Sequence, residues 1–149
     1  MARRDEAHAD DVPGQWFVDT RCISCDVARH WAPDLIGTDR SGRSFIARQP
    51  ATAEDEAKLW RAAVACPTKS IGNREVPRPP DAVFPYELTP RVWVLGHNAP
   101  SSFGGHSYLV FRLGGNLLID IVMLRCRRQT PFALALKSHR VKVWADRQN

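Results

Sequence analysis

The chain has 149 residues, of which 44% are hydrophobic and 25% are charged, a composition typical of globular rather than disordered protein. Its longest apolar run, residues 117–124, is interrupted by Asp120 and is too short to span a bilayer. The charged start MARRDEAHADD lacks the apolar centre of a secretory signal. We therefore expect a cytoplasmic protein that does not associate with membranes.

The net charge of +5 is distributed unevenly along the chain. Residues 122–149 hold seven basic residues and one acid, a net charge of +6, whereas the first 121 residues carry −1. A basic protein often binds nucleic acid, but here the basic residues gather in the tail and the rest is nearly neutral. We therefore do not expect nucleic acid to be the partner.

The first half of the chain predicts short strands and helices. Thr52 and Asp55 have the spacing of a capping box, with Asp in place of the usual Glu or Gln. The apolar residues that follow recur at helical spacing, so a helix is expected from Thr52 to Cys66. The expected elements before and after it are a mobile leader (1–14), a strand (15–19), a loop and short helix (22–33), a hairpin (35–36 with 44–47) and a closing strand (70–71).

The second half of the chain predicts strands only. Residues 73–90 hold five prolines and are typical of a linker. Three strands are expected after it, at 92–95, 106–112 and 116–119, and the last two form a hairpin. The predicted fold is thus α+β: leader (1–14), small domain (15–72), Pro-rich linker (73–90), incomplete antiparallel β segment (91–120) and basic tail (121–149).

Four cysteines are the chemically most informative residues: Cys22, Cys25, Cys66 and Cys126. In a cytosolic chain a C-x-x-C pair indicates metal binding or redox chemistry rather than a disulfide framework. Cys22 and Cys25 lie in a tight loop after a predicted strand, and Cys66 stands before Pro67 at a predicted helix end. Soft thiolates held close together in this way are the ligands of iron–sulfur clusters.

Two segments, separated by a predicted hairpin and helix, resemble the single-cluster 4Fe–4S ferredoxin family. Their sequences are WFVDTRCISCDVARHWAP and CPTKSIG. The resemblance covers residues 15–72, close to the full length of such a domain. It implies an electron-transfer module in which Cys22, Cys25 and Cys66 hold the cluster, with Trp16 and Trp31 shielding it. It also implies a redox partner protein, which the sequence does not identify.

One cysteine of the family pattern is missing, because position 28 is Ala28. The cluster is then either 4Fe–4S, with solvent or His30 on the fourth iron, or 3Fe–4S; Cys126 is a remote further candidate. A zinc site made of Cys22, Cys25, Cys66 and His30 would also satisfy the four-ligand rule. A metal-free interaction domain, with the cysteines as small buried hydrophobes, is the remaining alternative.

Residues 92–120, VWVLGHNAPSSFGGHSYLVFRLGGNLLID, resemble the first strands of the metallo-β-lactamase fold. Activity in that family depends on an H-x-H-x-D-H motif that binds catalytic metals. The motif is absent from this sequence, and His97 and His106 match early-strand positions instead. We therefore expect no catalytic residues and no enzyme activity from the chain as given. The alternative function is a fragment of a ferredoxin-fused hydrolase.

This second likeness stops after Asp120, where the sequence becomes strongly basic. We hypothesise a truncated or frame-shifted product, with residues 121–149 as an unselected tail; an ordinary basic tail is the alternative. An incomplete sheet would expose apolar faces and unpaired edges. Self-association through the β segment is therefore expected.

Overall fold

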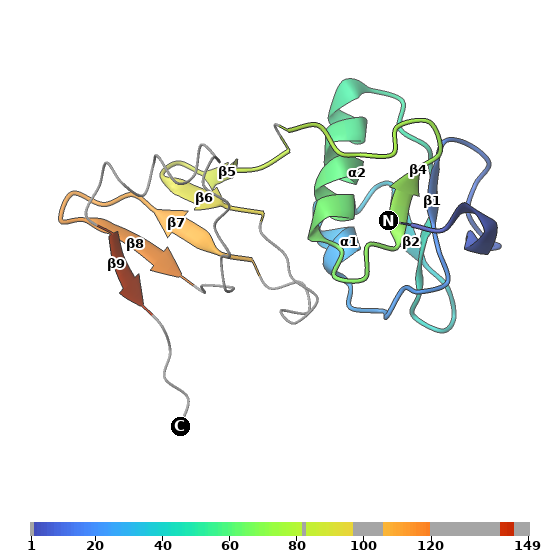
Figure 1. Cartoon of the computed structure of the whole chain (residues 1–149), viewed down its shortest axis with the longest axis horizontal. Coiled ribbons are helices and arrows are strands. Elements are labelled where there is room, and N and C mark those ends of the chain that lie inside the picture. Colours follow the sequence, from blue (N-terminus) through green and yellow to red (C-terminus); the bar gives the residue numbers. More distant parts are fainter. Residues whose placement is uncertain (1, 82, 97–105, 120–140, 145–149) are drawn as a thin grey trace. The chain divides into compact units, whose positions relative to one another are not determined.

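The computed structural model describes residues 2–81, 83–96 and 106–119, together with the backbone of 141–144. The chain forms two compact units and passes from the first to the second between Val83 and Phe84. Both contain small sheets, and the helices lie in the first (Figure 1). In the described residues no helix combines the length and the apolar character needed to cross a membrane.

The first unit is a mixed α/β arrangement. Its elements are η1 (Arg4–Glu6), β1 (Trp16–Val18), α1 (Val27–Trp31), β2 (Ile36–Thr38), β3 (Ser44–Ile46), α2 (Ala53–Ala65) and β4 (Ile71–Asn73). Strand β1 pairs antiparallel with β4, and β2 pairs antiparallel with β3. Helix α1 packs against α2, and both lie on one side of these strands (Figure 1). From β1 to β4, the order of strands and helices is the one that the sequence predicts.

The core of this unit lies between α2 and the strands. Trp16 and Trp60 meet edge to face, with ring centroids 4.6 Å apart, a geometry that aromatic pairs favour. Leu59 and Ile46 are fully buried beside them. The hydroxyl of Thr52 accepts a hydrogen bond from the backbone N–H of Asp55 at 3.1 Å, so α2 begins with the expected cap.

The N-terminal segment, predicted as a mobile leader, instead packs onto the first unit. His8 N–H donates to the carbonyl of Val18 at 2.7 Å, and Val12 N–H donates to that of Ile46 at 2.9 Å. The carboxylate of Asp11 accepts from Val18 N–H at 3.0 Å and from Ile46 N–H at 2.7 Å. One polar side chain therefore satisfies backbone donors of both β1 and β3, which composition alone does not reveal.

The second unit is a five-stranded sheet in the order β5-β6-β7-β8-β9. Its strands are β5 (Tyr86–Thr89), β6 (Val92–Val94), β7 (Tyr108–Val110), β8 (Asn116–Ile119) and β9 (Val141–Trp144), with β9 parallel to β8. Strand β5 lies inside the segment predicted as a linker. It forms because Pro85 and Pro90 flank it without occupying it, and because Arg91, with φ 71°, turns the chain back into β6.

The hairpin predicted at 106–119 is present as β7 and β8. Leu109 and Leu118 are cross-strand partners on one face, and both are buried. On the other face Ile119 is 37% exposed, whereas Val94 is buried. Self-association through this face stays a prediction. His97, Asp120, Cys126 and the frame-shift hypothesis for 121–149 fall largely outside the described residues.

The packing of the N-terminal segment gives a stability prediction. Asp11→Asn replaces one of the two carboxylate oxygens with an NH₂ group. That group cannot accept the hydrogen bond of the backbone N–H that it faces. The free energy of unfolding should fall by about 1–3 kcal/mol, the cost of an unsatisfied buried donor. Chemical denaturation measures it. The exposed neighbour Asp10 provides the control, because Asp10→Asn should change little; equal stability of the two variants would show that the segment is not held through Asp11.

Candidate metal centre

Three cysteines line one pocket of the first unit. It is formed by the loop between β1 and α1, the start of β3, and the turn between α2 and β4, and Ala28 lines it as well. Cys66 is buried, Cys22 is half-buried and Cys25 is exposed. Residues 22–28 and 66 are distant in sequence, so the fold has brought the three thiols to a single place.

Both cysteine-bearing loops contain residues in the left-handed region of backbone conformation. Ser24 and Asp26, on either side of Cys25, have φ of 56° and 66°, and Lys69 has φ of 53°. Non-glycine residues rarely adopt this conformation, which costs about 1–3 kcal/mol per residue and is concentrated at functional sites. The turns hold Cys25 at the surface between two constrained neighbours.

Two of the sulfur atoms accept hydrogen bonds from backbone N–H groups, and the sulfur of Cys66 also lies beside a hydroxyl. Ser44 N–H donates to Cys22 Sγ at 3.4 Å, and Ser70 N–H donates to Cys66 Sγ at 3.3 Å. The hydroxyl of Thr68 lies 3.4 Å from Cys66 Sγ and 2.6 Å from the hydroxyl of Ser70. Donors directed at sulfur stabilise a thiolate, the form that binds metal.

The pocket also disfavours ionisation of the Cys25 thiol. Burial raises the pKa of Cys25, and the neighbouring Cys66 and Cys22 raise it further, against the opposing effect of the Val27 N–H. A nearby positive charge would favour the ionised form of Cys25 instead. A metal centre supplies that charge, because it binds the deprotonated form and releases the protons.

A buried ion pair joins the two cysteine-bearing loops. Asp19 is fully buried, and its carboxylate accepts hydrogen bonds from Arg21 at 2.6 and 3.0 Å and from Arg3 N–H at 2.8 Å. Burial raises the pKa of this carboxyl, but the hydrogen bonds from Arg21 and Arg3 outweigh it and the pKa is lowered. Arg21 also donates to the carbonyl of Lys69 at 3.4 Å, so it reaches from the first cysteine loop to the second.

The β2–β3 hairpin lies beside the pocket and contributes Ser44 to its lining. At its tip Asp39 accepts hydrogen bonds from Ser41 N–H at 2.8 Å and Arg43 N–H at 2.9 Å. A Cβ added to Gly42 would lie 3.6 Å from the side chain of Ser24, so the tip rests against the cysteine loop. Strand β3 of the same hairpin carries Ser44, whose N–H donates to Cys22 Sγ.

The other residues considered from the sequence lie away from the pocket. His30 is exposed and does not line it. Trp16 is buried in the core and Trp31 packs against that core; neither lines the pocket, so they do not shield it as expected. Cys126 is outside the described residues. Among those that are described, no three His, Cys, Asp or Glu side chains are gathered so as to hold a single metal ion.

His106, which the sequence places at an early strand position, belongs to the second unit. It is buried, its ring stacks on Phe84 with centroids 6.1 Å apart, and burial lowers its pKa. Sequence reasoning did not identify Ser44, Thr68 or Ser70. Thr68 and Ser70 follow the Cys-Pro pair closely, which is a usable signal, but only the hairpin pairing brings Ser44 to the pocket.

Residues 18–73 match a family of known proteins. The family is the 4Fe-4S single cluster domain of Ferredoxin I. The matched segment contains Cys22, Cys25, Cys66 and Ala28 and spans less than half of the chain. A domain of this family indicates iron–sulfur binding and electron transfer. No curated protein and no solved structure matches the chain, and the family match does not extend to the metallo-β-lactamase resemblance of residues 92–120.

The tip of the β2–β3 hairpin should make the stability of the fold depend on pH. Hydrogen bonds from Ser41, followed by Arg43 N–H and His8, lower the pKa of Asp39 from 3.8 to about 2. A lowered carboxyl pKa stabilises the fold above the unfolded-state value, and this contribution disappears as pH falls from about 4 to about 2. Asp39→Asn should therefore be less stable than the parent at pH 7, and its stability should fall less steeply in that interval.

Thermal denaturation across the pH series measures this difference. Asp34→Asn serves as the control, because Asp34 is a largely exposed carboxylate that lies 3.7 Å from Lys58 Nζ. Parallel curves for the parent and Asp39→Asn would contradict the proposed role of Asp39.

Proposed function

We propose that this chain binds an iron–sulfur cluster through Cys22, Cys25 and Cys66 and transfers single electrons. The observation that carries the proposal is that these three cysteines line one pocket, within the segment that matches the single-cluster family. When bound, such a cluster supplies one-electron redox chemistry at a potential set by its ligands and surroundings. Cys66 would anchor it from the buried side and Cys25 from the exposed side.

The residues around the sulfurs fit this cofactor. Ser44 N–H, Ser70 N–H and the Thr68 hydroxyl are within hydrogen-bonding distance of Cys22 or Cys66. Hydrogen bonds to the ligating sulfurs stabilise added negative charge and are a main determinant of cluster potential. The chain would thus provide both the thiolate ligands and the hydrogen-bond donors that tune the reduction potential of the cluster.

The ligand set favours a cluster with three protein thiolates. Ala28 is 7% exposed and lines the pocket, so a methyl group stands where the family pattern has a cysteine. A 3Fe–4S cluster needs three thiolates, which is the number present, whereas a 4Fe–4S cluster would leave one iron to a ligand other than cysteine. We infer that the three-iron form is the stable one.

The alternatives have less support. A tetrahedral zinc site needs a fourth ligand, and its candidate, His30, is exposed and outside the pocket lining. The hydrolase-fragment hypothesis rests on the sequence of residues 92–120 alone, and the H-x-H-x-D-H motif is absent from the chain. Self-association and the identity of a redox partner stay predictions.

Anaerobic purification tests the ligand assignment. The parent chain should be brown and contain iron and acid-labile sulfide, with little zinc. Cys22→Ala, Cys25→Ala and Cys66→Ala should each lose most of the iron and the visible absorption, because two thiolates cannot hold the cluster. Zinc in place of iron, or iron content unchanged in all three variants, would refute the proposal.

Restoring the missing cysteine tests the cluster type. A 3Fe–4S cluster gives an electron spin resonance signal when oxidised, whereas a 4Fe–4S cluster of this class gives one when reduced. Ala28→Cys should therefore shift the signal from the oxidised to the reduced sample. Val27→Cys is the matched control, since Val27 precedes Ala28 on α1 and does not line the pocket; the same shift in that variant would contradict the role of position 28.

A further inference from the structure

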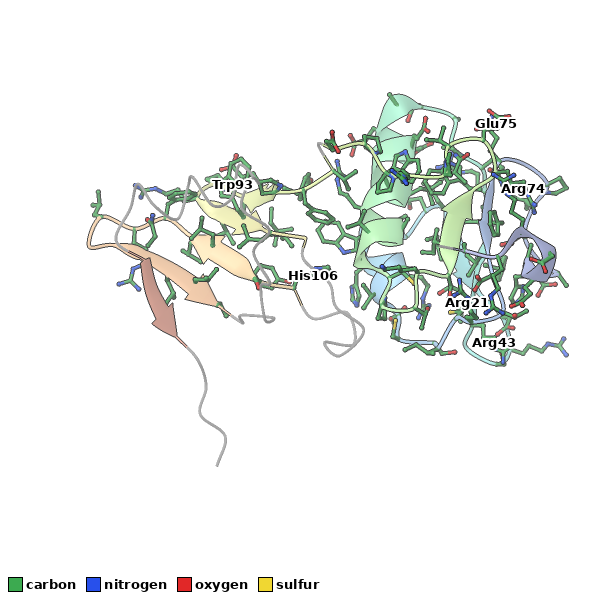
Figure 2. All side chains as sticks on the ribbon, viewed as in Figure 1. Arg21, Arg43, Arg74, Glu75, Trp93 and His106 are labelled. Atoms are coloured by element: carbon green, nitrogen blue, oxygen red, sulfur yellow. The ribbon has the colours of Figure 1, made fainter. Side chains whose placement is uncertain are left out.

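Three segments meet at the exposed side of the cysteine pocket. They are the cysteine loop, the tip of the β2–β3 hairpin and the turn between α2 and β4. The hairpin tip touches the cysteine loop at Gly42 and Ser24, and Arg21 links that loop to the carbonyl of Lys69. Figure 2 shows Arg21 and Arg43 at the same end of the first unit, away from Arg74. A partner that approaches Cys25 would meet all three segments.

These segments present uncompensated positive charge. Arg40, Arg43 and Lys69 are exposed, and within the described residues none of the three forms an ion pair. The nearby carboxylates are already engaged. Asp26 pairs with Arg29, and Asp39 accepts hydrogen bonds from Ser41 and lies 3.1 Å from His8 Nε2.

An exposed apolar side chain lies on the cysteine loop itself. Ile23 is 48% exposed and lines the pocket beside Cys25, which is also exposed. An apolar centre with a charged rim is the usual anatomy of a protein interface. Opposite charge on a partner would steer its approach and orient it.

We propose that a redox protein with an acidic surface docks next to the cysteine pocket. It would contact Ile23 and the three exposed cations Arg40, Arg43 and Lys69, which we call the basic rim. This inference rests on the proposed function, because it requires a cluster that exchanges electrons. A cluster held by Cys22, Cys25 and Cys66 would supply one electron to the redox centre of the acidic partner, and no proton or covalent bond would be transferred. The rim belongs to the first unit and includes no residue of the basic tail, 122–149.

Electron transfer to small complexes of opposite charge tests the rim directly. The full chain with its cluster is reduced with dithionite and then mixed with iron(III)–EDTA, an anion, or hexaammineruthenium(III), a cation. Electrostatic steering changes association rates by about 10- to 1,000-fold and weakens with ionic strength. The rate with the anion should therefore fall as salt rises, and the rate with the cation should rise.

Charge reversal locates the effect. In Arg40→Glu/Arg43→Glu/Lys69→Glu the rate with the anion at low salt should fall at least about tenfold, and its salt dependence should invert. Arg78→Glu is the matched control, because Arg78 is an exposed cation in the segment after β4; it should leave both rates nearly unchanged. The visible spectrum and the midpoint potential of each variant confirm that the cluster is intact and that driving force is not the cause.

Protein acceptors test the class of partner. An acidic b-type cytochrome should be reduced faster at low salt than at high salt, and basic cytochrome c should show the opposite. The docking proposal fails if a cluster-loaded chain shows the same salt dependence with both proteins, if the triple variant behaves like the parent, or if single-stranded DNA binds the rim more tightly than the acidic cytochrome does. If no cluster assembles at all, it is the proposed function that fails.

Discussion

The cysteine pocket depends on one buried carboxylate. Asp19 follows β1, is fully buried, and is held ionised by Arg21 and by the backbone N–H of Arg3. An uncompensated charge at this depth would be very costly, so Arg21 is fixed in place. From there it reaches the carbonyl of Lys69. The loop that carries Cys22 and Cys25 is thereby joined to the turn that follows Cys66, and three thiols remote in sequence share one pocket.

The chemistry of the pocket follows from the thiols and the donors around them. Burial and the neighbouring thiols raise the pKa of Cys25, while the N–H groups of Ser44 and Ser70 donate to the sulfurs of Cys22 and Cys66. Both features are compatible with a cofactor that carries positive charge and takes soft ligands. Ala28 stands where the family pattern has a cysteine, so the chain presents three cysteines to this pocket.

Much of this arrangement follows from local sequence signals. The Thr52 cap and the apolar spacing after it define α2, and the C-x-x-C and Cys-Pro pairs by themselves indicate the candidate ligands. Contacts between distant segments were not predictable. Asp11 holds the N-terminal segment through bonds to β1 and β3, and Ser44 reaches Cys22 only because the hairpin folds onto Ser24. Strand β5 escaped prediction because its flanking prolines resemble a linker, although neither lies within the strand.

Native mass spectrometry of the anaerobically purified chain tests the central claim most directly, because the added mass identifies the cofactor and its iron count in one measurement. We expect the mass of the chain plus three irons and four sulfides, and a gain of one iron in Ala28→Cys. The bare mass of the chain, or that mass plus one zinc ion, would contradict the account of Cys22, Cys25 and Cys66 as a three-thiolate cluster site.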